Sequence, residues 1–152
     1  MSIITSTEQD NVQIIQWDDG KANAVSAPLL QELNQALDQA ERDKRVVLLV
    51  GRPGRFSAGF DLQVMGQGGT AMAELVVGGA RLALRLMQFP TPVVMVCSGH
   101  SLAMGGLLLQ VGEASIDVEE VAPFIKFKLA QVGYVTFLPC DTEVRVPSFK
   151  LE

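Results

Sequence analysis

The sequence lacks the features that mark several large classes of protein. Its 152 residues include only two cysteines, Cys97 and Cys140, which stand far apart and in no metal-binding spacing. No disulfide framework is therefore indicated. No apolar run approaches the ~18 residues of a membrane span, and the N-terminus lacks the basic and apolar segments of a secretory signal. These absences predict a cytoplasmic protein without a membrane span.

Positive charge is also scarce. Lysine and arginine number 12 against 17 aspartates and glutamates, which gives a net charge of -5. Because a nucleic-acid-binding protein needs a basic face, we expect no nucleic-acid partner. An acidic chain also repels phosphates at long range, so any phosphate-bearing ligand must be met by local lysine or arginine side chains.

Several catalytic motifs are missing as well. The sequence has no P-loop, no GxGxxG pattern and no Ser-His-Asp order, and it contains a single histidine, His100. Hydrophobic residues make up 48% and charged residues 19% of the chain, proportions that are typical of a globular protein. The length fits one domain with a sizeable core.

What the sequence does contain is one pattern that occurs twice: an apolar strand, a Gly-containing loop and the start of a helix. Residues 46–50 precede the loop RPGRFSAGFDL at 52–62, and residues 93–96 precede a Ser-Gly break and an apolar helix at 102–109. A turn of this kind leaves backbone N–H groups unpaired. These groups can point at an anion or at a developing negative charge. The simpler interpretation is a buried strand packed on a buried helix.

The rest of the first 109 residues alternates strands and helices. Two β-type runs, 2–7 and 12–17, flank a turn signal and predict a hairpin. Ser26 is the predicted N-cap of a helix with an apolar stripe at helical spacing. A flexible loop at 66–69 precedes a second long helix that ends before Pro90. The order predicts an α/β fold with a mixed or parallel sheet.

The two loop motifs together carry a resemblance to a known family. FSAGFDL at 56–62, followed by PTPVVMVCSGHSLAMGG at 90–106, resembles the crotonase superfamily, the enoyl-CoA hydratase/isomerase family. The similarity is good over 14–109 and poor over 110–139. It implies a crotonase-like ββα spiral whose core occupies 1–139, followed by an extended tail at 140–152. We expect a shortened or divergent C-terminus, because no pattern for the family's C-terminal helical region follows Gln110.

The resemblance implies a chemistry. Members of this family act on acyl-CoA thioesters in fatty acid metabolism, as hydratases, which are lyases, or as double-bond isomerases. They stabilise the thioester enolate in an oxyanion hole built from two backbone amides. The matching positions are Phe60 and Met104. Coenzyme A is then part of the substrate, and no bound cofactor or metal is expected. The alternative for Phe60 is an ordinary core aromatic.

The resemblance also places a set of loop residues against the acyl-CoA. Near its nucleotide and pantetheine lie Lys21, Ala22 and Ala24. Beside the thioester arm lie Ala58, Asp61 and Leu62. Lys21 is the predicted phosphate partner, unless it is a solvated loop lysine, and Arg52 and Arg55 are further candidates. Asp61 can equally serve as a carboxylate at a helix N-terminus.

The chain departs from the family at the catalytic glutamates. Leu107 stands at one glutamate position and Gln131 matches the other, and neither side chain can act as a general base. Glu119 and Glu120 are either substitutes or a solvated pair in a loop. Two hypotheses follow: an enoyl-CoA hydratase or isomerase, or a non-catalytic member of the family that binds acyl-CoA or partner chains.

Two further expectations concern packing and assembly. His100 is expected to pack at the strand–helix turn rather than to act as a base. The crowded apolar run at 107–111 is expected to form an exposed patch, and such patches usually meet a partner. Since members of the family assemble as trimers, we expect a homo-oligomer, and a trimer in particular.

Overall fold

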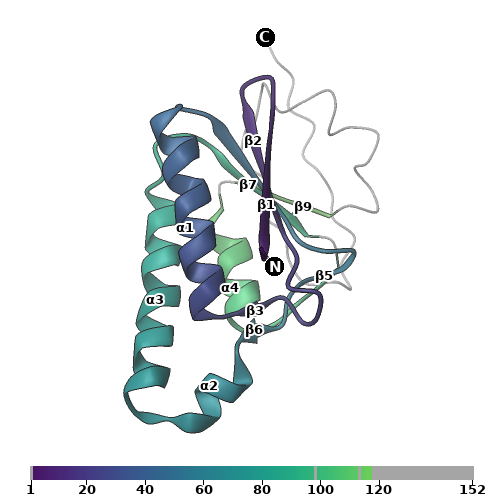
Figure 1. Ribbon diagram of the computed structural model, residues 1–152. Helices are drawn as coiled ribbons and strands as arrows, with labels where there is room; N and C mark the ends of the chain where they lie inside the picture. Colours follow the sequence, from purple (N-terminus) through teal and green to yellow (C-terminus); the bar gives the residue numbers. More distant parts are fainter. Residues whose placement is uncertain (1, 98, 113, 118–152) are drawn as a thin grey trace.

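A mixed five-stranded sheet forms the centre of the computed structural model, which describes residues 2–97, 99–112 and 114–117 (Figure 1). Its strands, in sheet order, are β1 (Ile4–Gln9), β2 (Val12–Trp17), β4 (Val46–Val50), β7 (Val93–Cys97) and β9 (Ala114–Asp117). The first two strands form the predicted antiparallel hairpin, and the other neighbouring pairs are parallel. The predicted α/β layout with a mixed sheet is confirmed.

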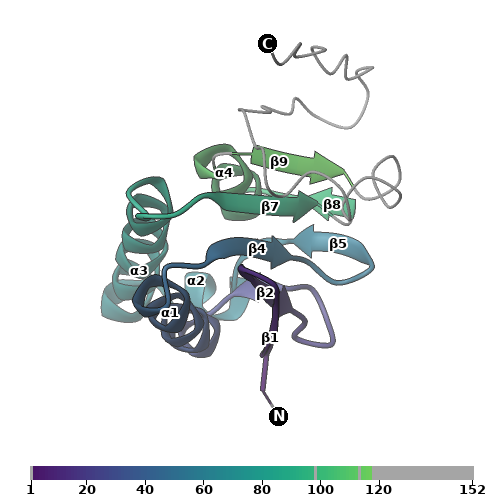
Figure 2. The same ribbon diagram turned by 90° about the horizontal axis from the view of Figure 1, so that it is seen from above.

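Two long helices cover one face of this sheet. Figures 1 and 2 show α1 (Ala27–Arg42) and α3 (Gly69–Met87) side by side on the same side of the strands. The strand residues on this face include Ile15, Leu49 and Met95, which are register neighbours and are all fully buried. Leucines of both helices and Leu108 of α4 (Met104–Val111) pack against them. The main core therefore lies between the helices and the sheet.

The start of α1 follows the sequence prediction closely. Ser26 is the N-cap, and its hydroxyl accepts a hydrogen bond of 3.4 Å from the backbone N–H of Leu29. Pro28 lies in the first turn, where its missing N–H costs no hydrogen bond. The predicted apolar stripe is buried from Leu29 to Ala40, except for Leu30, which is half-buried. Ser26 therefore fixes the point at which the preceding loop becomes a helix.

Four short strands were not predicted from the sequence. β3 (Ala24–Val25) pairs in parallel with β6 (Gly59–Phe60), and β5 (Gly54–Ser57) pairs in parallel with β8 (Gly99–Ser101). Figure 2 shows β5 and β8 beyond the carboxyl ends of β4 and β7. These pairs join the two Gly-containing loops to each other and to the loop before α1.

The prediction of a flexible loop at 66–69 is wrong. A short helix, α2 (Leu62–Gln67), extends through its first half, and α3 begins at Gly69, so Gly68 alone separates the two helices. Gly68 and Gly69 adopt φ angles of 65° and 61°. Glycine reaches this left-handed region without steric cost, and the chain can therefore reverse direction in a single residue.

The glycine pair inside α3 has a packing explanation. A Cβ atom on Gly78 would lie 2.7 Å from Cδ1 of Leu30, and a Cβ atom on Gly79 would lie 2.6 Å from the ring of Phe60. Glycine costs an exposed helix about 1 kcal/mol relative to alanine. At these two positions it allows α1 and the Phe60 ring to approach α3 closely.

Two expectations about individual side chains are corrected. His100 is exposed in β8, opposite Arg55 of β5, because alternation along the strand places it on the other face from the half-buried Gly99 and Ser101. The run at 107–111 is not uniformly exposed, since Leu108 is fully buried on the inner face of α4 while Leu107 is 55% exposed. Gln131, Glu119, Glu120, Cys140 and the expected C-terminal tail lie outside the described residues. Among the residues that are described, no helix is long and apolar enough to cross a membrane.

Candidate functional site

A cavity of about 400 Å³ lies where the loop before α1 meets the first Gly-containing loop. The residues that line it are Asp19, Lys21, Ala22, Ala24, Ser26, Ala58, Phe60, Asp61, Leu62 and Gln63. All six residues that the sequence predicted to contact the substrate are among them. The two predicted segments, 21–24 and 58–62, therefore line the same cavity.

Asp19 holds the loop that forms one side of this cavity. Its Oδ1 accepts hydrogen bonds from the backbone N–H groups of Lys21 and Asn23, at 2.7 and 2.8 Å, and its Oδ2 accepts one from Ala24 at 3.0 Å. Partial burial raises the pKa of the Asp19 carboxyl. The three backbone hydrogen bonds and the positive charge of Arg52 outweigh it, and the pKa lies below its usual value. Asp19 is therefore a weak base whose oxygens already have partners.

Asn23 is a buried residue that the sequence analysis did not single out. It adopts a φ of 50°, a left-handed conformation that asparagine tolerates better than most residues. Its Nδ2 donates to the backbone oxygens of Trp17 and Phe56, at 2.8 and 3.1 Å, while its Oδ1 accepts from Asp19 N–H at 3.0 Å. Asn23 thus fastens the cavity loop to the strands β2 and β5.

Ser57 joins the same loop to both Gly-containing motifs. Its side chain is fully buried. The hydroxyl donates to the backbone oxygen of Asn23 at 2.7 Å and accepts from Gly59 N–H at 3.1 Å. Its carbonyl oxygen accepts from Leu102 N–H at 2.8 Å. The sequence analysis gave no role to Asn23 or to Ser57, although Ser57 lies within the motif FSAGFDL, because a serine or asparagine in a loop is usually exposed.

The two residues predicted to form the oxyanion hole lie on adjoining segments. A Cβ atom on Gly59 would come within 2.9 Å of Ala103 Cβ and 3.3 Å of Met104 N, so the residue before Phe60 packs directly on the start of α4. Met104 is the first residue of α4, and the N–H groups of a first helical turn have no acceptor within the helix. The preceding residue, Ala103, provides no side-chain cap.

The Phe60 side chain is half-buried and extends toward α3. Its ring packs over Gly79, where the side chain of Met104 also approaches. The interpretation of Phe60 as a core aromatic and its predicted role as a backbone donor are therefore compatible, because the two involve different parts of the residue.

The acids of the cavity wall are already engaged. Asp61 is the N-cap of α2, and its Oδ1 accepts from Gln63 N–H at 2.9 Å. Asp19 is held as described above. Leu107, at a glutamate position of the family, contributes no carboxylate. Among the described residues that line the cavity, no carboxylate is therefore left without a backbone hydrogen bond.

Two basic residues, Lys21 and Arg52, meet in the loop beside the cavity. Lys21 is exposed on its wall, and Arg52 donates from Nη1 to the Lys21 backbone oxygen at 2.6 Å. The Arg52 Nε lies 3.5 Å from Asp18 Oδ1, which orients the guanidinium. The two cations thus lie together with the carboxylates of Asp18 and Asp19.

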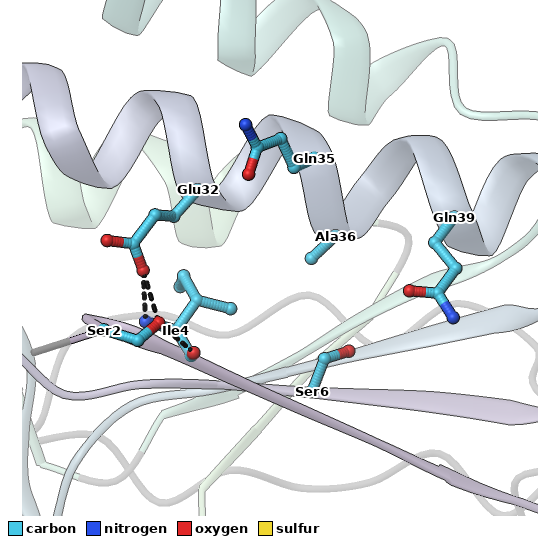
Figure 3. A pocket seen from close by; sticks show the side chains of 7 residues that line it. All are labelled: Ser2, Ile4, Ser6, Glu32, Gln35, Ala36 and Gln39. Carbon is cyan, nitrogen blue, oxygen red and sulfur yellow. Dashed lines mark hydrogen bonds between the residues drawn. The ribbon is translucent and has the colours of Figure 1, made fainter.

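A second cavity, of about 410 Å³, lies between β1 and α1 (Figure 3). Its polar centre is Glu32, whose Oε2 accepts from Ser2 Oγ, Ile3 N–H and Ile4 N–H at 2.7, 2.8 and 3.1 Å. The Ser2 hydroxyl and these backbone groups lower the pKa of Glu32. The carboxylate thus fastens the first strand to α1, and the other polar groups drawn in Figure 3, Ser6, Gln35 and Gln39, are uncharged.

Comparisons with known proteins agree on one family. The enoyl-CoA hydratase/isomerase family model matches residues 7–135. A probable enoyl-CoA hydratase of Bacillus subtilis (strain 168) is 32% identical over 113 residues, which cover 72% of this chain and 43% of that protein.

Solved structures give the same result. An enoyl-CoA hydratase/isomerase family protein from Pseudomonas syringae superposes with a TM-score of 0.74 at 36% identity, covering 76% of this chain and 50% of that one. An enoyl-CoA hydratase from Mycobacterium marinum superposes with a TM-score of 0.71 at 38% identity, covering 74% of this chain and 50% of its own. The chain thus spans about half the length of the relatives that it matches.

Proposed function

The chain belongs to the enoyl-CoA hydratase/isomerase family and has its crotonase-like fold, and on this basis we propose that it binds an acyl-CoA thioester in the cavity beside Phe60. One observation carries the proposal. The segments 21–24 and 58–62, which the family resemblance assigned to the substrate, form one cavity wall directly beside the start of α4.

The proposed chemistry uses backbone donors. The thioester carbonyl is directed at the N–H groups of Phe60 and Met104, which stabilise negative charge on its oxygen when the thioester is attacked or enolised. Losing one such donor typically costs on the order of 10²–10³ in rate. The contact of Gly59 with the start of α4 supports this arrangement, because it holds the two donor segments together. Lys21 and Arg52 supply the positive charge for the phosphates of coenzyme A.

A second candidate function is binding without turnover. Leu107 stands where the family carries a glutamate, and both acids of the described cavity wall are held by backbone N–H groups. A positioned general base typically contributes 10²–10⁴-fold to the rate. Without one, the chain polarises a bound thioester but transfers protons slowly.

Calorimetry and activity assays separate these possibilities. The chain is titrated with crotonyl-CoA and with free coenzyme A, and crotonyl-CoA hydration and 3-enoyl-CoA isomerisation are measured in parallel. Binding of both ligands supports the proposal, and turnover then decides between the two candidates. The Lys21→Ala variant is expected to weaken binding of both ligands, whereas Lys44→Ala, at the far end of α1, is not. Failure of the intact chain to bind either ligand would overturn the proposal.

A further inference from the structure

Ser57 constrains the backbone on one side of the Phe60 amide, and a contact with β3 constrains the other side. Its hydroxyl accepts from Gly59 N–H at 3.1 Å and is itself anchored by donating to Asn23 O at 2.7 Å. The peptide unit between Ala58 and Gly59 is therefore fixed. The peptide unit between Phe60 and Asp61 is fixed too, since Asp61 N–H donates to Val25 O at 3.0 Å. Because peptide units are planar, the unit between them, which carries Phe60 N–H, has little freedom to rotate.

The same residue also holds the segment that carries the second donor. The Ser57 carbonyl oxygen accepts from Leu102 N–H at 2.8 Å, and Leu102 O accepts from Gly105 N–H at 2.9 Å. A Cβ atom on Gly105 would lie 2.6 Å from Ser57 Cβ. The first turn of α4, and with it Met104, thus rests directly on Ser57.

From these contacts we infer that Ser57 is the positioning residue of the oxyanion hole: its hydroxyl aligns Phe60 N–H, and its carbonyl and Cβ place Met104. The inference rests on the proposed function, since it assigns a role within that same site. Ser57 does not itself touch the substrate. Its full burial and the three backbone segments that it joins distinguish it from a serine that only fills space.

Removal of the hydroxyl tests the inference, and the chain offers a matched control. Ser57→Ala deletes the group that aligns the Gly59 peptide. Ser101 is the register partner of Ser57 in β8, and its Oγ is buried with no hydrogen-bond partner among the described residues. Ser101→Ala therefore removes a buried hydroxyl next to the same helix start without removing a hydrogen bond.

The decisive readout is the infrared carbonyl band of crotonyl-CoA, isotope-labelled at its thioester carbon and bound to the full chain. Hydrogen bonds from the two amides lower its frequency relative to free crotonyl-CoA. In Ser57→Ala we expect this shift to fall to about half or less, because hydrogen bonds weaken steeply at angles below ~120°. Free coenzyme A has no thioester carbonyl. The affinity of Ser57→Ala for it is therefore expected to stay within about twofold of the affinity of the unaltered chain. Ser101→Ala is expected to keep the full shift.

The outcomes are distinguishable. A shifted band in the unaltered chain with an equal shift in Ser57→Ala overturns the role of Ser57 and leaves the oxyanion hole intact. An unshifted band in the unaltered chain overturns the oxyanion hole and the role of Ser57 together. If Ser57→Ala does not fold, Ser57→Cys carries the test, because the thiol fills the same site but is a weaker donor and acceptor. An intermediate shift in Ser57→Cys supports the inference, and a full shift overturns it.

Discussion

The backbone of Gly59 packs so closely on Met104 that a Cβ atom at Gly59 would lie 3.3 Å from the Met104 nitrogen. Gly59 also adopts a φ of 88°, which residues with a Cβ rarely do. Two segments separated by more than 40 residues thus meet backbone to backbone, at the place where the family resemblance locates the oxyanion hole.

Gly59→Ala tests the contact itself. The added methyl group would lie 2.9 Å from Ala103 Cβ and 3.0 Å from Leu102 O, so the two segments must move apart. We expect a loss of roughly 1–3 kcal/mol in the free energy of unfolding, measured by urea denaturation, from backbone strain and from the clash. Gly54→Ala is the control, because Gly54 has a φ of 75° but no atom within 4 Å of the added methyl. Equal losses in the two variants would show that the contact adds nothing beyond the strained φ.

Glu32 predicts how stability depends on pH. Its pKa is lowered in the folded chain by the Ser2 hydroxyl and the backbone N–H groups of Ile4 and Ile3. A lowered pKa contributes stability that is present above the pKa of the unfolded state and is lost as the pH falls through the lower pKa of the folded state. Glu32→Gln is therefore expected to flatten the acid limb of the stability–pH curve. Glu74→Gln, at an exposed position on α3, is the control for the removal of one carboxylate. Acid limbs of equal steepness in the unaltered chain and Glu32→Gln would contradict the prediction.

Leu107→Glu restores a carboxylate at a glutamate position of the family. The sequence alone raises the concern that a glutamate here is buried and unpaired, but Leu107 is 55% exposed. We therefore expect a change in stability within about 0.5 kcal/mol, as at most surface positions. If the family alignment holds, crotonyl-CoA hydration should rise in this variant. Leu102→Glu is the control, because Leu102 is 60% exposed but does not match a glutamate of the family. Equal gains in both variants would point to a non-specific effect of the added charge.

Hydratase and isomerase activity of the unaltered chain is expected to be at least ~10²-fold below that of an active relative, because no positioned base is found among the described residues of the cavity. Gln131→Glu, outside the described residues, is expected to recover some isomerase activity, since one carboxylate can move a proton between two carbons. Turnover comparable to that of an active hydratase would show that another base exists, and Glu119, Glu120 and Asp61 would be the first to mutate.

Self-association remains a prediction. Several large apolar side chains of the described surface are exposed: Leu62, Val77, Leu84, Met87, Leu102 and Leu107. Three of them lie on α3, so the apolar surface is not confined to the run at 107–111 that suggested it. A trimer is expected by light scattering at high protein concentration, and a monomer there would contradict it.

The longer elements were predictable from the sequence because each carries its own periodic signal. The stripe of α1, the N-cap Ser26 and the β-branched strands β4 and β7 all follow from local composition. The motifs at 56–62 and 90–106 also identified the family, because their order and spacing are more specific than either motif alone. The six predicted contact residues share a cavity for the same reason: the motifs specify segments that the fold brings together.

The features that the sequence missed depend on long-range contacts. A strand of two residues such as β3 or β6 has no periodicity, and its pairing is visible only in three dimensions. The same holds for Ser57 and Asn23, whose burial follows from the segments around them rather than from their own type. From the sequence alone, Gly79 only lowers the helix propensity of its segment. The structure shows that it leaves space for the ring of Phe60.

We propose that a bound thioester carbonyl lies between the amides of Phe60 and Met104. The most direct test follows the backbone amide resonances of the isotope-labelled chain by NMR during titration with crotonyl-CoA and, separately, with free coenzyme A. We expect the resonances of the Phe60 and Met104 amides to shift strongly with crotonyl-CoA and much less with coenzyme A. The Ile3 and Ile4 amides, which donate to Glu32 at the second cavity, should stay in place. Saturable binding of crotonyl-CoA that leaves Phe60 and Met104 unmoved, or that moves Ile3 and Ile4 instead, would contradict it.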